Sequence, residues 1–300
     1  MAGRVLITGI EGFTGQHLAR HLRKRGYEVY GTSRKLPVPA EPPAIRVFSA
    51  DLARAEDWLP VIKEAQPDYI IHLAGISFAA SGNLKAYYDV NTVGTQHVLE
   101  AVAKSGLDFK KIITASSAAV YGALEGGELT EEHPLRPQSH YGISKLATEH
   151  VARLFFDCLP IMVVRPFNYT GRGQPENFVV PKIIAHFEKH AEFIELGNID
   201  VEREFNDISY ACDVYERLLR SEKAVHDAVN LCTGRGVTLR SVIEDAEKLY
   251  NHKIEIRINP AFVRPNEARR MVGNPEKLNR MIDPVAVCPF YETLETVKGL

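Results

Sequence analysis

The sequence has few of the features that mark metal-binding, secreted or membrane proteins. Its 300 residues include only four cysteines, and none forms a Cys-x-x-Cys pair or lies near a His cluster at zinc-finger spacing: Cys158, Cys212, Cys232 and Cys288. We therefore expect reduced thiols and no metal. No stretch approaches the roughly 20 apolar residues of a membrane span. The first apolar run is too short for a secretory signal. By elimination we expect a cytoplasmic protein with no membrane partner.

Basic and acidic residues are nearly equal in number. The formal net charge is -2, from 36 basic and 38 acidic residues, so no overall electrostatic argument favours nucleic acid as a partner. A polyanionic small molecule would have to be bound by local arginines. Hydrophobic residues make up 45% and charged residues 25% of the chain, and there are no repeats or low-complexity tracts, which predicts a soluble globular fold.

Short apolar runs alternate with amphipathic stretches through the first half of the chain. We expect strands at 4–8, 28–32, 44–48, 69–73, 111–114 and 161–164, and helices at 15–25, 55–65, 85–104 and 141–157. Near-continuous apolar strands between helices indicate a doubly wound parallel sheet, an α/β fold of the Rossmann type. After Phe167 the pattern becomes irregular, with expected helices at 179–189 and 237–250. We predict a dinucleotide-binding domain at 1–167 and a smaller α/β portion at 168–300, not fully independent, that mainly binds substrate.

A glycine-rich segment joins the first expected strand to the first expected helix. Glycines in such a turn let the backbone approach a diphosphate, and the helix N-terminus offers free N–H groups to its oxygens. The position makes a plain strand-to-helix turn the weaker interpretation. The candidate cofactor-binding residues here are Gly9, Gly12, Phe13, Thr14 and Gly15.

The end of the second expected strand bears on the choice between NAD and NADP. An acidic residue there would bind the ribose 2′-hydroxyl, whereas cations suit a 2′-phosphate. The sequence has Ser33 followed by Arg34 and Lys35, with no acid. We predict NADP(H), with Ser33 and Arg34 as cofactor contacts. NAD(H) remains the alternative, in which Arg34 and Lys35 are ordinary solvated charges.

Three residues form a candidate catalytic group. Tyr141 and Lys145 are four apart on an expected helix, which places both on one face. A nearby ammonium would lower the pKa of the phenol, and Lys145 could also hold the nicotinamide ribose. Ser117, which follows the expected strand at 111–114, could donate a hydrogen bond to a substrate oxygen while Tyr141 transfers a proton.

These motifs together resemble the extended short-chain dehydrogenase/reductase superfamily. The Gly-x-x-Gly-x-x-Gly spacing is typical of it, and so are Asp51-Leu52, His72-Leu73-Ala74-Gly75 and Asn91. The resemblance implies that Asp51 and Leu52 lie by the adenine, that Leu73, Ala74 and Gly75 line the cofactor, and that Asn91 lies near the active site. It also implies a homodimer formed through the two helices that carry Asn91 and Tyr141.

The second half resembles the sugar-nucleotide branch of this superfamily, with GDP-4-keto-6-deoxy-D-mannose reductases as the most similar subgroup. The resemblance implies these substrate-binding residues: Asn168, Asn177, Val180, Gly197, Arg203, Arg264 and Glu267. Arg203 and Arg264 would bind the diphosphate and Glu267 a ribose. Two departures are Glu204, where Asp is commoner, and Met281-Ile282-Asp283-Pro284, where a Leu-Gly-Trp-x-Pro element is usual.

The residues after Ser117 carry information about the reaction. The related 4,6-dehydratases place one or two acids there to remove a hydroxyl, but this chain has Ala118 and Ala119, which cannot do acid–base chemistry. The leading hypothesis is NADPH-dependent reduction of the C4 keto group of a GDP-4-keto-6-deoxy-hexose, giving a GDP-6-deoxy-mannose type product. An NDP-sugar 4-epimerase with retained NAD is the alternative. A non-catalytic dinucleotide sensor is a remote third, disfavoured by the intact Ser117, Tyr141 and Lys145.

Overall fold

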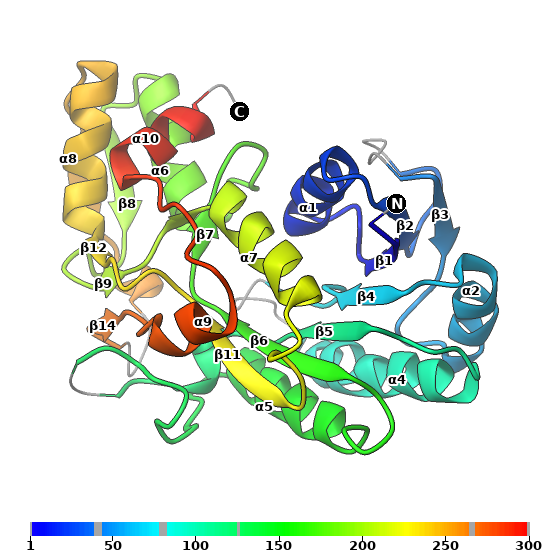
Figure 1. Ribbon diagram of the computed structural model, residues 1–300. Coiled ribbons are helices and arrows are strands. Elements are labelled where there is room, and N and C mark those ends of the chain that lie inside the picture. Colours follow the sequence, from blue (N-terminus) through cyan, green and yellow to red (C-terminus); the bar gives the residue numbers. More distant parts are fainter. Residues whose placement is uncertain (1, 39–43, 78–82, 125–126, 264–267, 299–300) are drawn as a thin grey trace.

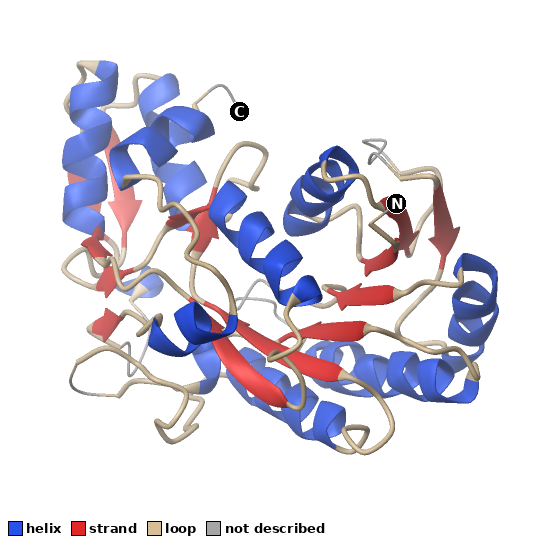
Figure 2. Cartoon of the chain, viewed as in Figure 1, coloured by secondary structure: helices blue, strands red, loops and turns tan. Residues whose placement is uncertain are grey.

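A seven-stranded parallel sheet forms the centre of the protein. The computed structural model describes residues 2–38, 44–77, 83–124, 127–263 and 268–298. The strand order is β11-β6-β5-β4-β1-β2-β3, and every neighbouring pair is parallel (Figure 2). The strands are β1 (Arg4–Thr8), β2 (Glu28–Ser33), β3 (Arg46–Ser49), β4 (Tyr69–His72), β5 (Lys111–Ala115), β6 (Ile161–Pro166) and β11 (Asp227–Leu231). The expected Rossmann-type α/β fold is confirmed.

The direction in which successive strands are added to the sheet reverses next to β1. From β1 the chain proceeds outward through β2 and β3, and it then returns to β4 on the other side of β1. The loops that follow β1 and β4 therefore leave in opposite directions. Doubly wound sheets bind their ligands at the carboxyl ends of the strands beside such a reversal, and we expect the cofactor there.

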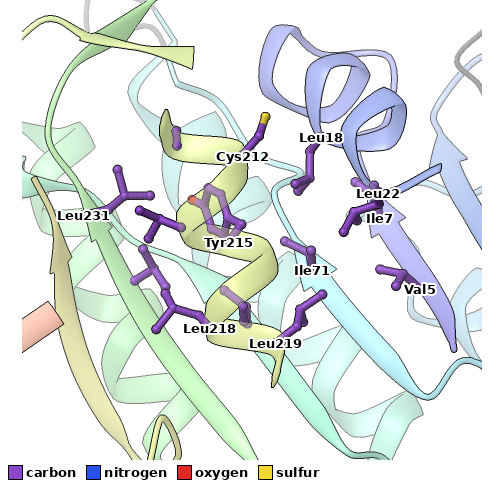
Figure 3. Close-up of a cluster of buried hydrophobic side chains, with 14 of the residues drawn as sticks. Val5, Ile7, Leu18, Leu22, Ile71, Cys212, Tyr215, Leu218, Leu219 and Leu231 are labelled. Carbon is purple, nitrogen blue, oxygen red and sulfur yellow. The ribbon is translucent and has the colours of Figure 1, made fainter. Parts of the chain in front are cut away.

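Two helices cover one face of the sheet, α1 (Phe13–Lys24) and α7 (Ile208–Arg220). Apolar side chains of both helices meet those of the central strands in one buried cluster, which includes Leu18 and Leu22 of α1 and Tyr215 and Leu218 of α7 (Figure 3). Because α7 comes from the second half of the chain, this core joins both halves.

The other face is covered by α2 (Trp58–Ala65), α4 (Gly94–Lys104) and α5 (His140–Arg153). In this second core Trp58 is fully buried, together with aliphatic residues of β1, β4, β5 and β6. Helices α4 and α5 lie side by side along this face (Figure 1). Burial on both faces explains why the strands are apolar along their whole length.

The second portion packs beside the carboxyl end of the sheet. Its helices α6 (Val179–Glu188), α8 (Leu239–Tyr250) and α10 (Phe290–Val297) share an apolar core with β8 (Phe193–Leu196) and β13 (Glu255–Ile258) (Figure 1). Two further small sheets pair β7 (Tyr169–Thr170) with β10 (Asn206–Asp207), and β9 (Glu202–Arg203) with β12 (Val237–Thr238) and β14 (Arg270–Met271). The helix α9 (Glu276–Met281) follows β14. Strand β11 lies beyond Phe167 yet completes the large sheet.

The expected helix at 85–104 is interrupted. It consists of a short α3 (Leu84–Ala86), a π-helical segment η2 (Tyr87–Val93) and α4. The carbonyl oxygen of Asn91 accepts hydrogen bonds from Thr95 Oγ1 at 2.6 Å and Thr148 Oγ1 at 2.8 Å. These hydroxyls compensate for the altered backbone pattern, and such π-helical turns are frequent at functional sites. Smaller differences are that β3 begins at Arg46, not Ala44, and that α5 ends at Arg153, not Asp157.

Candidate active site

The glycine segment has the geometry of a diphosphate cradle. Gly9 has a φ of +68°, and a Cβ there would stand 2.9 Å from the Cα of Ala74. A Cβ on Gly15 would lie 2.5 Å from the carbonyl oxygen of Gly9. Gly12 caps α1 with no side-chain hydrogen bond, and no acid lies in the first turn. The glycines thus let the backbone of this loop pack closely. The N–H groups at the N-terminus of α1 and the positive end of its dipole are suited to binding a dinucleotide diphosphate.

The segment after β4 lies beside residues predicted to bind the cofactor and residues predicted to be catalytic. A Cβ on Gly75 would lie 2.8 Å from Asn91 Oδ1 and 3.5 Å from Lys145 Nζ. Asn91 is buried, accepts a hydrogen bond from Ile76 N at 2.8 Å and donates one to Ser144 Oγ at 3.0 Å. Asn91 therefore fixes the loop that begins at Leu73 against the helix that carries the candidate catalytic pair.

A buried histidine connects this loop to the glycine segment. Thr8 Oγ1 accepts a hydrogen bond from Ala74 N at 3.0 Å, so its proton is directed to His72 Nδ1 at 2.8 Å. His72 Nε2 then donates to Thr95 Oγ1 at 3.0 Å. Burial lowers the pKa of His72 to about 3, with a smaller contribution from the charge of Lys145, so the ring is neutral. This chain of hydrogen bonds ends at the Asn91 carbonyl.

The structure brings together the three predicted catalytic residues. Ser117 caps a short 3₁₀ turn, and its Oγ accepts a hydrogen bond from Ala119 N at 3.1 Å. The Ser117 side chain lies close enough to the Tyr141 hydroxyl to lower the pKa of that phenol. Lys145 is almost fully buried one turn after Tyr141, and its Nζ donates to the Ala115 carbonyl at 2.9 Å.

The pKa of Tyr141 is shifted in the opposite direction from the one expected from the sequence. We expected Lys145 to lower the pKa of Tyr141, but burial raises that pKa, and the nearby Ser117 side chain opposes the effect only in part. The ammonium of Lys145 is held by a backbone carbonyl instead. Burial also lowers the pKa of Lys145 to about 8. A phenol that keeps its proton at neutral pH is suited to donating it, as an acid catalyst of reduction must.

A buried ion pair lies next to the candidate catalytic group, and we did not predict it from the sequence. The carboxylate of Glu149, one turn after Lys145, accepts hydrogen bonds from Arg165 Nε at 2.9 Å and from Arg165 Nη2 at 2.8 Å. It also accepts a hydrogen bond from Ser116 Oγ at 2.6 Å. The side chains of Arg165 and Glu149 are only 3% and 1% exposed. An arginine inside the apolar run of β6 was the signal that could have indicated this pair.

The residues predicted for the adenosine end lie at the carboxyl ends of β2 and β3. Ser33 Oγ donates to the Lys35 carbonyl at 2.8 Å, which shapes a turn that leaves Arg34 and Lys35 exposed. Asp51 Oδ1 accepts from Ala53 N at 2.9 Å. Leu52 is buried, and a Cβ on Gly94 would lie 2.6 Å from it, so its side chain packs against α4.

The predicted substrate residues are spread over the second portion. Asn168 and Asn177 are exposed, whereas Val180 is buried in the core around α6. A Cβ on Gly197 would lie 2.5 Å from the Phe262 carbonyl oxygen. Arg203 donates to the Ala268 carbonyl at 2.6 Å. Arg264 and Glu267 lie outside the described residues.

The departure at Glu204 has a structural explanation. Glu204 is fully buried, and its carboxylate accepts hydrogen bonds from the backbone N–H of Gly273 at 2.7 Å and of Thr233 at 2.8 Å. It also accepts from Asn206 Nδ2 at 2.7 Å. Burial raises its pKa. The longer side chain thus joins three loops beside Arg203, a role that sequence reasoning did not predict.

Comparison with known proteins agrees with this geometry. Residues 6–295 match the family described as GDP-mannose 4,6 dehydratase. The chain belongs to this family. It is an NAD(P)-dependent enzyme of the extended short-chain dehydrogenase/reductase type. Ala118 and Ala119 nevertheless follow Ser117, at the positions where the resemblance described above leads us to expect acids in a dehydratase.

Relatives with other named activities also bear on the reaction that this chain catalyses. The chain is 34% identical over 276 residues to GDP-6-deoxy-D-talose 4-dehydrogenase of Aggregatibacter actinomycetemcomitans, covering 92% of this chain and 90% of that one. It is 31% identical over 290 residues to GDP-6-deoxy-D-mannose reductase of Pseudomonas aeruginosa, covering 93% and 90%. The solved structure of RMD from Pseudomonas aeruginosa complexed with NADPH superposes with a TM-score of 0.84 at 27% identity, covering 98% and 97%.

The described residues contain neither a helix suited to crossing a membrane nor a cluster of metal ligands. No helix in that part of the chain is long and apolar enough to cross a membrane. In the same ranges, no three His, Cys, Asp or Glu side chains gather as a metal site would require.

Proposed function

We propose that the enzyme reduces the C4 keto group of a GDP-4-keto-6-deoxy-hexose with NADPH. The observation that carries this is that Ser117 lies beside Tyr141 and that two alanines follow Ser117 in the sequence. The pair can hold and protonate a carbonyl oxygen, but no acid is present to expel a hydroxyl. The names of both relatives describe redox chemistry on GDP-6-deoxy sugars, and talose and mannose differ only at C4.

The chain's own residues have separate roles in this proposal. The bound dinucleotide supplies the hydride. Tyr141 donates its proton to the C4 oxygen, and Ser117 orients that oxygen by hydrogen bonding. Lys145 places a positive charge beside the cofactor loop at Gly75. The portion at 168–300 mainly holds the sugar nucleotide, with Arg203 near its diphosphate.

Isotope transfer tests the reaction. With NADPH carrying deuterium at the transferable position, the product sugar should carry deuterium at C4, as read by NMR of the purified product. Tyr141→Phe should abolish the transfer, and Tyr250→Phe, a change far from the site, should not. Product without deuterium at C4, or interconversion of NDP-sugars with no net use of NADPH, would reject the proposal and favour a 4-epimerase.

The cofactor is proposed to be NADP(H). Arg34 and Lys35 extend into solvent from the end of β2, and no carboxylate among the described residues pairs with either. Two unpaired cations suit a 2′-phosphate. The ratio of kcat/KM for NADPH to that for NADH should exceed ten and should fall at least tenfold in Arg34→Ala. Arg23→Ala, an exposed arginine on α1, should leave the ratio unchanged. A preference for NADH in the unaltered enzyme would overturn the assignment.

We also propose a cytoplasmic homodimer that forms through η2, α4 and α5. Large apolar side chains are exposed on this face: Val93 is 45% exposed, Ile143 40% and Leu154, at the end of α5, 75%. Ile143→Glu should convert a dimer to a monomer in gel filtration. Ile258→Glu, at a comparably exposed apolar residue on β13, is the matched control and should not. A monomer in the unaltered protein at micromolar concentration would reject this interface.

A further inference from the structure

A segment of the second portion lies directly on the first turns of α1. Tyr169 OH is 2.8 Å from Thr14 Oγ1, and the rings of Tyr169 and Phe13 stack with their centroids 6.3 Å apart. One turn further, His17 Nε2 lies 2.8 Å from the Arg172 carbonyl oxygen. These contacts join residues about half the chain apart, so the loop after β6 is fixed against the glycine segment.

Tyr169 contacts the first turn of α1 directly, and the catalytic candidate Tyr141 is near enough to influence it electrostatically. Its hydroxyl touches Thr14, the second residue of α1, where the helix N–H groups are free to bind a diphosphate. Burial raises the pKa of Tyr169, and the charge that Tyr141 would carry if ionised makes a smaller contribution. A dinucleotide with its diphosphate at α1 and its nicotinamide at Tyr141 must pass alongside Tyr169.

One hydroxyl hydrogen of Thr14 and Tyr169 is free to donate to a ligand. Each hydroxyl carries one hydrogen, and the bond between Thr14 and Tyr169 uses only one of the two. The remaining O–H can donate outward, and phosphate oxygens only accept. The pair is only partly buried, so a ligand can reach it. A hydroxyl pair with a purely packing role would have no need to lie at a helix N-terminus.

We propose that Thr14 and Tyr169 form a hydroxyl pair that donates a hydrogen bond to a diphosphate oxygen of the nicotinamide dinucleotide. Tyr169 is thereby a cofactor ligand contributed by the substrate-binding portion. The next residue toward the N-terminus, Asn168, is a predicted substrate contact, so one loop serves both ligands. This inference rests on the use of a dinucleotide and not on the identity of the sugar.

Binding measurements without sugar test the pair. The Kd of NADPH is measured by nicotinamide fluorescence for Tyr169→Phe, Thr14→Val and the double variant. Each single variant should bind about tenfold more weakly, because the hydroxyl that donates to the charged phosphate is either removed or no longer oriented by its partner. The double variant should be little weaker than either single one, because both remove the same interaction. Tyr250→Phe is the matched control and should bind normally.

ADP-ribose, which has the diphosphate but no nicotinamide, locates the contact. Its affinity should fall by the same factor as that of NADPH in both single variants, with melting temperatures unchanged. Normal NADPH binding by Tyr169→Phe and Thr14→Val would overturn the proposal, and so would ADP-ribose binding that neither variant weakens. Failure to reduce a GDP-keto sugar would leave these results standing, because no sugar is present in this assay.

Discussion

Neutralising Glu149 tests whether the buried ion pair supports the catalytic group. Its carboxylate accepts three hydrogen bonds, two from the Arg165 guanidinium and one from Ser116 Oγ. In Glu149→Gln, an amide NH2 must face a guanidinium that solvent barely reaches. Breaking such a buried pair typically costs about 3–5 kcal/mol. For a chain of 300 residues that corresponds to a drop in Tm of about 5–8 °C.

The same change should alter the catalytic group through Lys145. The charge of Glu149 raises the pKa of Lys145 and so opposes the effect of burial, which lowers it to about 8. Without that charge the pKa should fall further, and the pH at which activity is lost should move down with it. A change that affected folding alone would lower Tm without moving the pH profile.

Thermal unfolding by circular dichroism and the pH dependence of kcat/KM are the two measurements. Glu255→Gln, which breaks an exposed pair with Arg257, is the matched control and should change neither. A Tm shift below about 2 °C for Glu149→Gln would show that the pair contributes little, and an unmoved pH profile would refute its link to Lys145.

Three further outcomes follow from the site. Gly15→Ala should weaken NADPH binding at least tenfold in a fluorescence titration, because its Cβ would stand 2.5 Å from a backbone carbonyl oxygen of the same loop; unchanged affinity would contradict the proposed cradle. The kcat/KM for reduction should fall as pH rises through about 8, since Lys145 then loses its proton while Tyr141, whose pKa is raised, keeps its own; a flat profile from about pH 6 to 10 would argue against a charged Lys145. Glu204→Leu should destabilise the protein by about 2–6 kcal/mol in denaturant unfolding, because it leaves buried N–H groups of two loops unpaired; a smaller loss would mean that solvent reaches them.

Local patterns in the sequence predicted six of the seven strands of the large sheet and the glycine turn between β1 and α1, but not β11. A strand buried on both faces is apolar along its length, and the glycines after β1 have a spacing that few other structures require. The pair Tyr141 and Lys145 was equally visible, since four residues on a helix return to the same face.

Contacts between distant segments could not be predicted in the same way. The bond between Thr14 and Tyr169 joins residues 155 apart, and nothing in either segment indicates the other. The raised pKa of Tyr141 depends on how deeply the folded chain buries the phenol. The π-helical turn at Asn91 depends on hydroxyls from two helices. Such features depend on packing, which residue spacing does not encode.

The proposed function depends most directly on one progress curve, the loss of NADPH absorbance when the enzyme is mixed with GDP-4-keto-6-deoxy-D-mannose. The geometry of Ser117 and Tyr141 leads us to expect one NADPH oxidised per sugar reduced, with the rate at least 100-fold lower in Tyr141→Phe. No loss of NADPH, or loss that continues unchanged in Tyr141→Phe, would contradict the assignment of this site as a reductase.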